Sequence, residues 1–168
     1  MNALSSHYRV GEAIRLRGQL WGEPLEGGAG SGVRLGRTRG TFSGTDALGM
    51  SVNPDAVAWA AEDDLPSVIL GEGARLANEK FLFTLGMRCK TLVVLLTAEN
   101  AAQRRRERGS DQNPTWIKGR ATASFRMFEK AVTNGIPALP VDTTNIGPTA
   151  IADIIREAID LPMDEASV

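Results

Sequence analysis

Arginine side chains gather in the middle of the chain, where Arg104, Arg105, Arg106 and Arg108 follow one another closely. On a helix, Arg104 and Arg108 lie on one face, at an i,i+4 spacing where like charges cost roughly 0.2 to 0.5 kcal/mol unless something compensates them. A polyanion would compensate them, because guanidinium groups bind phosphate oxygens bidentately. The alternative is a solvated basic face with Glu107 as an internal partner.

A carboxylate stands between two glycines in Gly71-Glu72-Gly73, directly after an apolar stretch. At the end of a parallel strand, Glu72 is well placed to hold a magnesium-bound water or a substrate hydroxyl. We expect Arg75 to contact the substrate beside it. The alternative is that Glu72 caps the following helix or pairs with Arg75.

Residues 33–46 mix short extended pieces with glycines, which let backbone amides approach a ligand closely. We predict a substrate-binding segment here, with Arg39 on an anion, Asp46 on a hydroxyl or base edge, and Thr45 beside them. The alternative is a turn in which Asp46 or Ser43 only satisfies backbone amides.

The elements that must position these groups alternate along the chain. Strands are expected at residues 67–70, 92–96 and 136–141, and the second has the apolar, β-branched composition of a strand buried on both faces. Helices are expected at residues 53–61, 76–85 and 148–159, in the segment that carries Arg104, Arg105, Arg106 and Arg108, and along a face formed by Ala121, Phe125, Phe128 and Val132. A polar, mobile loop is expected to hold Trp116, Lys118 and Arg120. This alternation predicts an α/β fold with a three-layer, mostly parallel sheet.

Residues 1–32 are the least regular part of the chain, and Ala13, Leu16, Leu20 and Trp21 predict at most one face of a short helix. The glycine-rich stretch at 25–32 has two glycines at the spacing of the phosphate loop G-x-x-x-x-G-K-[ST]. However, Val33 and Arg34 stand where Lys and Ser or Thr are required, and no strand is expected before it. We therefore interpret this stretch as a flexible loop.

Composition excludes several classes of function. The formal net charge is -1, so no overall field attracts nucleic acid or membrane, and any anion site must be local. Cys89 is the only cysteine and His7 the only histidine, which argues against a disulfide, a His-based triad or a His/Cys zinc site. No apolar run approaches the length of a membrane span. We expect a soluble, cytoplasmic protein.

The buried strand at 92–96, the helix with Arg104 and Arg108, and the Gly-Arg at 119–120 together resemble the lid region of P-loop nucleotide kinases. Thymidylate and adenylate kinases share this layout, and small phage-encoded kinases of nucleotides or DNA bases are also similar. The resemblance implies that Arg104, Arg108 and Arg120 close over the phosphates of Mg-ATP. It further places Gln112 and Trp116 near the adenine or the lid hinge, Glu72 near Mg²⁺, and Asp46 with Arg39 on the acceptor.

One part of the family pattern is absent from these 168 residues, namely the first strand and its phosphate loop. That strand lies at the centre of the family's sheet, so we expect either a start upstream of Met1 or a degenerate relative, with a poorly filled core and weak ATP binding. The expected organisation is an N-terminal segment (1–32), a kinase-like domain (33–160) with a lid at about 104–120, and a tail (161–168).

The expected function is transfer of the ATP γ-phosphate to a nucleotide or to a base in nucleic acid. The alternative is a non-catalytic module that binds a nucleotide or single-stranded nucleic acid through the arginine helix and Trp116. Nothing in the sequence fixes the acceptor or the oligomeric state.

Overall fold

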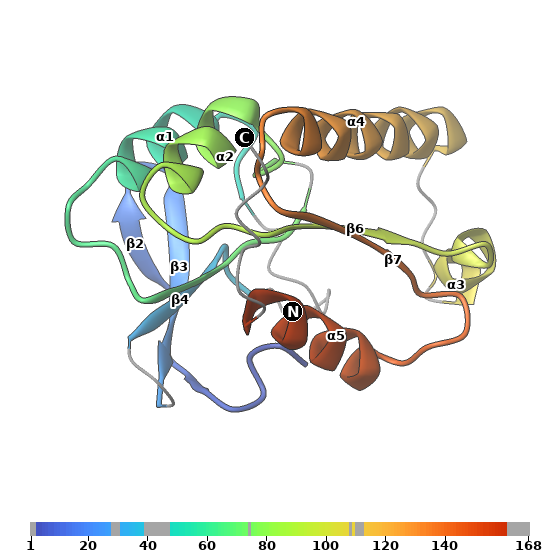
Figure 1. Cartoon of the computed structure of the whole chain (residues 1–168), viewed down its shortest axis with the longest axis horizontal. Coiled ribbons are helices and arrows are strands. Elements are labelled where there is room, and N and C mark those ends of the chain that lie inside the picture. Colours follow the sequence, from blue (N-terminus) through green and yellow to red (C-terminus); the bar gives the residue numbers. More distant parts are fainter. Residues whose placement is uncertain are drawn as a thin grey trace.

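The computed structural model describes residues 3–27, 31–38, 48–73, 75–107, 109 and 113–160, and it is an α/β structure with two sheets. Figure 1 shows helices α1, α2 and α4 on one side of the strands and α5 on the other. The strands are β1 (Arg9–Val10), β2 (Ile14–Arg17), β3 (Leu20–Glu26), β4 (Gly32–Leu35), β5 (Val68–Leu70), β6 (Val93–Thr97) and β7 (Ala138–Asp142). The helices are α1 (Asn53–Ala60), α2 (Glu79–Gly86), α3 (Ala101–Glu107), α4 (Pro114–Thr133) and α5 (Pro148–Asp160).

The strands do not form the single, mostly parallel sheet that was expected. The first sheet has the order β1-β3-β4-β5, with β2 also paired to β3, and only its β4–β5 pair is parallel. The second sheet consists of β6 and β7, which are parallel. The predicted alternation of strands and helices after residue 66 is confirmed, and none of the described helices is long and apolar enough to cross a bilayer.

The N-terminal segment consists largely of strands, so the helix expected around residues 13–21 is wrong. β2 and β3 form an antiparallel hairpin at Gly18, whose φ of 47° lies in the left-handed region that glycine tolerates. Apolar and arginine side chains alternate along β2, and this period-two pattern favours a strand.

The glycine-rich stretch at 25–32 joins two antiparallel strands, β3 and β4. A strand does precede it, contrary to expectation, but Val33 and Arg34 are buried within β4. The stretch therefore does not lead from a strand into a helix, which is the setting of a phosphate loop. β3 also lies on the side of β4 away from β5, so it cannot replace a central strand between β5 and β6.

The main hydrophobic core lies between the first sheet and helices α1 and α2. Trp59 is buried there, as predicted, together with side chains from β3, β4 and the segments that flank the helices. Helix α2 begins after Asn78, whose side-chain oxygen accepts a hydrogen bond from the backbone N–H of Phe81. The core therefore holds α1 and α2 firmly against β4 and β5.

An ion pair is buried in the first sheet between Glu23 of β3 and Arg34 of β4, with both side chains only 7% exposed. The Arg34 Nε donates to Glu23 Oε2 at 2.8 Å, and the Thr38 backbone N–H donates to Glu23 Oε1 at 2.6 Å. Burial by itself raises the pKa of Glu23, but the hydrogen bonds from Thr38 and Arg34 outweigh it and hold that pKa below its ordinary value.

Two predictions of burial are wrong in the second half of the chain. β6 is only half-buried, and Leu96 is 53% exposed. On α4, Phe125 and Val132 are more than half exposed, whereas Ala131 is buried. The covered face of α4 is formed by residues one position before most of the predicted ones, as Ala131 is before Val132. A shift of one residue rotates the covered face by about 100° around the axis of an α-helix.

Candidate functional site

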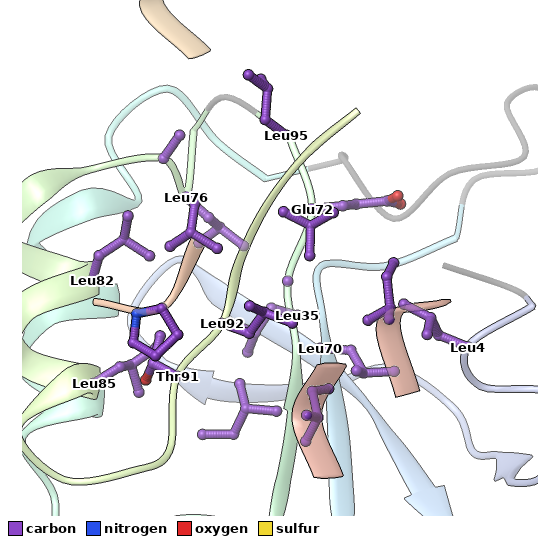
Figure 2. Close-up of a pocket in the computed structure, with 18 of the residues that line it drawn as sticks. Leu4, Leu35, Leu70, Glu72, Leu76, Leu82, Leu85, Thr91, Leu92 and Leu95 are labelled. Atoms are coloured by element: carbon purple, nitrogen blue, oxygen red, sulfur yellow. The ribbon is translucent and has the colours of Figure 1, made fainter. Parts of the chain in front are cut away.

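A cavity of about 1080 Å³ separates β5 from β6. β5 pairs with β4 and β6 pairs with β7, and among the described residues neither β5 nor β6 has a strand partner on its other edge. Figure 2 shows apolar side chains from several elements around this space. They include Leu4, Leu35, Leu70, Leu76, Leu82, Leu85, Leu92 and Leu95.

The cavity explains why β6 is half-buried. A parallel strand is normally covered on both faces and hydrogen-bonded on both edges, and an unpaired edge leaves backbone N–H and C=O groups without a ladder. Helix α4 contributes Met127 and Phe128 to the wall, and α5 contributes Ile151 and Ile155. The two helices therefore border a space whose apolar lining suits an additional strand.

Glu72 lies in the wall of this cavity, immediately beyond the carboxyl end of β5 (Figure 2). The glycines on either side fix the path of the backbone. A Cβ on Gly71 would lie 3.1 Å from Leu76 Cδ1, and Gly73 has a φ of 88°. This is the edge at which ligands bind in open α/β sheets. Arg75 follows in the same turn and is half-buried.

A magnesium ion needs only one or two protein carboxylates, because substrate phosphates and water complete its shell. Glu72 offers one such carboxylate at the carboxyl end of a parallel strand. No group of three or more His, Cys, Asp or Glu residues that could hold a metal occurs within the described ranges. The role of Glu72 at a magnesium ion stays a prediction.

Arg104 joins helix α3 to the loop that follows β7. Its Nη2 donates to the carbonyl oxygens of Thr143 at 2.7 Å and Thr144 at 2.8 Å. The Glu99 backbone N–H donates to Thr144 Oγ1 at 3.0 Å, and Thr143 Oγ1 donates to the carbonyl of Thr97 at 2.8 Å. The carboxyl ends of β6 and β7 and the start of α3 thus form one hydrogen-bonded unit.

Asp142 closes the same loop at the end of β7. Its Oδ1 accepts hydrogen bonds from Thr144, from the backbone N–H at 2.9 Å and from Oγ1 at 2.6 Å. These bonds, helped by the positive charge of Arg104, lower the pKa of Asp142. The sequence resembles the C-terminal strand and helix of the kinases at Pro-Val-Asp-Thr-Thr-Asn, but no site residue was predicted there, although an Asp followed by Thr after a strand is a recognised turn signal.

We expect Arg104→Ala to lower the free energy of unfolding by about 1.5 to 3 kcal/mol, because hydrogen bonds from a charged group contribute about this much, and these two are part-buried. Urea denaturation measures the change. Arg106→Ala is the matched control, since Arg106 is exposed on the same helix and should change stability by less than about 0.5 kcal/mol. Equal effects of the two variants would show that the contacts with Thr143 and Thr144 are not stabilising.

Trp116 and Arg120 lie on the first turns of α4, so the loop predicted for them is wrong. Asn113 precedes the helix and its side chain accepts a hydrogen bond from the Thr115 backbone N–H at 2.8 Å. Trp116 is 51% exposed, and the Arg120 Cζ lies 5.5 Å from the centre of its ring. The Arg120 Nε is buried and has no hydrogen-bond partner among the described residues. The guanidinium is therefore held against the indole ring of Trp116.

The structure brings together only some of the predicted site residues. Glu72 and Arg75 lie in one turn after β5, whereas Arg104 is bonded to the loop after β7 and Arg120 is stacked on Trp116. The roles of these residues stay predictions. Five other predicted residues lie outside the described residues, namely Arg39, Thr45, Asp46, Arg108 and Gln112.

Comparison with known proteins gives one match. A family model described as P-loop Nucleotide Kinase3 matches residues 24–160. The match includes β4 to β7 and all five helices, but not β1 or β2. No curated protein and no solved structure matches the chain.

Proposed function

We propose that this chain, which belongs to the P-loop Nucleotide Kinase3 family, is a phosphotransferase that moves the γ-phosphate of Mg-ATP to a nucleotide or to a base in nucleic acid. The proposal includes the place of the donor phosphates. They bind where an additional apolar strand, which is none of β1 to β7, enters the cavity between β5 and β6. A loop of the type G-x-x-x-x-G-K-[ST] at the carboxyl end of this strand cradles the phosphates. The tests below supply the strand and its loop as a peptide.

The observation that supports this proposal most directly is the cavity itself. Its walls are apolar, two parallel strands present unpaired edges to it, and Glu72 stands at the end where strands of such sheets bind ligands. A polar ligand would not favour the apolar walls, but an apolar strand would. The loop after that strand would then bring phosphates close to Glu72.

Each predicted residue has a place in this proposal. Phosphoryl transfer depends chiefly on positioning and on stabilising the charge of the phosphates. Glu72 holds a magnesium-bound water, Arg120 and Arg108 contact the donor phosphates, and Trp116 with Gln112 borders the nucleotide. Arg104 orients α3 through the loop after β7 in addition to its predicted contact with phosphate. Asp46, Arg39, Thr45 and Arg75 bind the acceptor.

The test is a transfer assay with γ-labelled Mg-ATP and a panel of acceptors, namely the nucleoside monophosphates and a single-stranded oligonucleotide. The reaction contains a strand–loop peptide, which has six alternating valine and isoleucine residues followed by Gly-x-x-x-x-Gly-Lys-Ser. We expect label on one acceptor, and Arg120→Ala should reduce the rate by about 10²-fold or more, as loss of one charge-stabilising donor does.

Lys118→Ala is the control for this assay, because Lys118 has the same charge, lies in the same part of α4 and is exposed. It should leave the rate within about twofold, since Lys118 has no proposed role in the transfer and its exposed charge is screened at physiological salt. If no acceptor is labelled, or if Lys118→Ala and Arg120→Ala reduce the rate equally, the proposed function is wrong.

A binding module without catalysis is the second candidate, and one observation favours it. The sequence G-x-x-x-x-G-K-[ST] does not occur in these 168 residues, and the nearest match joins two antiparallel strands. In that case Mg-ATP or an oligonucleotide would bind to the chain, but no label would be transferred with the strand–loop peptide present.

A further inference from the structure

Two arginines converge on one indole ring at the edge of the first sheet. The Cζ atoms of Arg15 and Arg37 lie 5.0 Å and 5.1 Å from the centre of the Trp21 ring. Arg15 and Trp21 are cross-strand partners in the β2–β3 hairpin, and Arg37 follows β4 by two residues. We refer to Arg15, Trp21 and Arg37 as the arginine–tryptophan stack.

The charges of this stack differ from those of the other arginines in the sheet. Arg9 pairs with Glu26, Arg17 with Glu62, and Arg34 with Glu23. By contrast, neither Arg15 nor Arg37 has a side-chain hydrogen bond or an ion pair within the part of the chain that the structure describes. Both positive charges lie beside one ring, so an anion placed there would be attracted to both.

The stack lies at the same edge of the sheet as Glu72. The Gly36 backbone N–H donates to the Trp21 carbonyl at 2.7 Å, which fixes Trp21 beside the carboxyl end of β4. Leu35, one residue earlier, lines the cavity together with Gly71 and Glu72. The carboxyl ends of β4 and β5 are neighbours because these strands pair in parallel. A ligand on the stack would therefore extend toward the turn after β5, which holds Glu72 and Arg75. Arg75 is one of the residues proposed to bind the acceptor.

We propose that the arginine–tryptophan stack binds the phosphate backbone of a single-stranded nucleic acid, so that the acceptor is a base in a strand rather than a free nucleotide. This proposal rests on the proposed function, whose acceptor it specifies. The family match begins at residue 24, so it includes neither β2 nor the start of β3.

The chemistry of the stack suits a strand. The indole holds both guanidinium planes in place, so less side-chain entropy is lost when their N–H groups bind phosphate. Arg15 is exposed and Arg37 is half-buried, so the stack is an open surface. Small molecules bind in concave sites, whereas a nucleic-acid backbone follows open basic surfaces that carry aromatic rings.

The test is fluorescence anisotropy of a labelled twelve-nucleotide oligothymidylate over a range of salt concentrations, without ATP. We expect Arg15→Ala and Arg37→Ala each to weaken binding several-fold. Each should also reduce the slope of log K against log salt by about 0.7, the value for one phosphate contact with a single strand. Thermal melting verifies that the variants fold, and Arg15→Gln, which keeps most of the side-chain stem, is the substitute if Arg15→Ala does not.

Arg17→Ala is the matched control, because Arg17 lies on the same strand but is paired with Glu62 at 2.6 Å. It should change neither the affinity nor the slope. The proposal is overturned if the oligonucleotide does not bind, or if the stack variants keep the wild-type slope, or if Arg17→Ala has the same effect as Arg15→Ala. The transfer assay tests the proposed function separately, since it measures phosphoryl transfer to any acceptor of its panel, whereas the anisotropy measurement contains no ATP and reports only binding to the stack.

Discussion

Replacing Glu23 by glutamine is expected to lower the free energy of unfolding by about 3 to 5 kcal/mol, the usual cost of removing one partner of a buried ion pair. The neutral side chain leaves the Arg34 guanidinium buried without its counter-charge. It also replaces one acceptor oxygen by an amide that would face an N–H of either Arg34 or Thr38. Urea denaturation followed by far-UV circular dichroism measures the loss.

Glu26→Gln is the control for this variant. Glu26 also belongs to β3, but its ion pair with Arg9 spans 3.7 Å between side chains that are 61% and 85% exposed. We expect a change below about 1 kcal/mol, as for most exposed pairs. Equal losses in the two variants would contradict a special role for the buried pair.

The pH dependence of stability gives an independent check on Glu23. Its pKa is lower in the folded protein than in the unfolded chain, so its contribution is fully present above the ordinary glutamate pKa of about 4.3 and is lost as the pH falls through the folded value. Wild type should therefore lose stability more steeply than Glu23→Gln below about pH 4.3. Parallel curves for the two proteins would show that the carboxylate is not stabilised by folding.

Much of the α/β half was predictable from the sequence because its signals are local. The strand at 67–70 and the helices expected at 53–61, 76–85 and 148–159 have apolar periodicity together with Pro, Asn or Gly at their ends, and the second helix begins three residues later than expected, at Glu79. The same reasoning failed at Pro114, although an Asn-Pro pair had correctly indicated the start of α1. There the polar residues before Pro114 favour a loop, whereas the Asn113 side chain accepts a hydrogen bond from the Thr115 backbone N–H and begins a helix.

The sequence pattern was sufficient to recognise a strand in the N-terminal segment, but not to predict which strands pair with one another. The alternation of Ile14 and Leu16 with arginines is a strand pattern, yet it is only four residues long. Which strand pairs with which depends on contacts between distant residues, such as Trp21 with Gly36. For this reason neither the buried Glu23–Arg34 pair nor the stacking of Arg15 and Arg37 on Trp21 was predicted.

The burial of α4 and β6 could not be predicted from periodicity alone. Periodicity shows that a helix has an apolar face, but the neighbouring elements decide which side chains are covered. On α4 the walls of the cavity select Met127 and Phe128 rather than Phe125. The cavity beside β5 and β6 agrees with the expectation of a poorly filled core. That expectation came from the kinase family that the sequence resembles, whose sheet has a central strand that these 168 residues lack.

An apolar strand is expected to bind between β5 and β6 and to stabilise the protein strongly. At a concentration 100 times its dissociation constant, the strand–loop peptide should raise the free energy of unfolding by about 2.7 kcal/mol. The reason is that it buries apolar surface against the cavity walls and hydrogen-bonds to two strand edges. A peptide with proline in place of its central valine is the control, because proline cannot donate to a ladder. Equal stabilisation by both peptides would indicate non-specific binding.

The most direct test of the proposed donor site is a calorimetric titration of the chain with Mg-ATP, alone and with the strand–loop peptide at saturation. We predict weak binding to the chain alone and at least about tenfold tighter binding with the peptide, a gain of about 1.4 kcal/mol. A peptide with alanine in place of the loop lysine should bind to the protein but give most of this gain back. If the peptide binds and the affinity for Mg-ATP stays the same, the cavity between β5 and β6 is not the place of the donor phosphates.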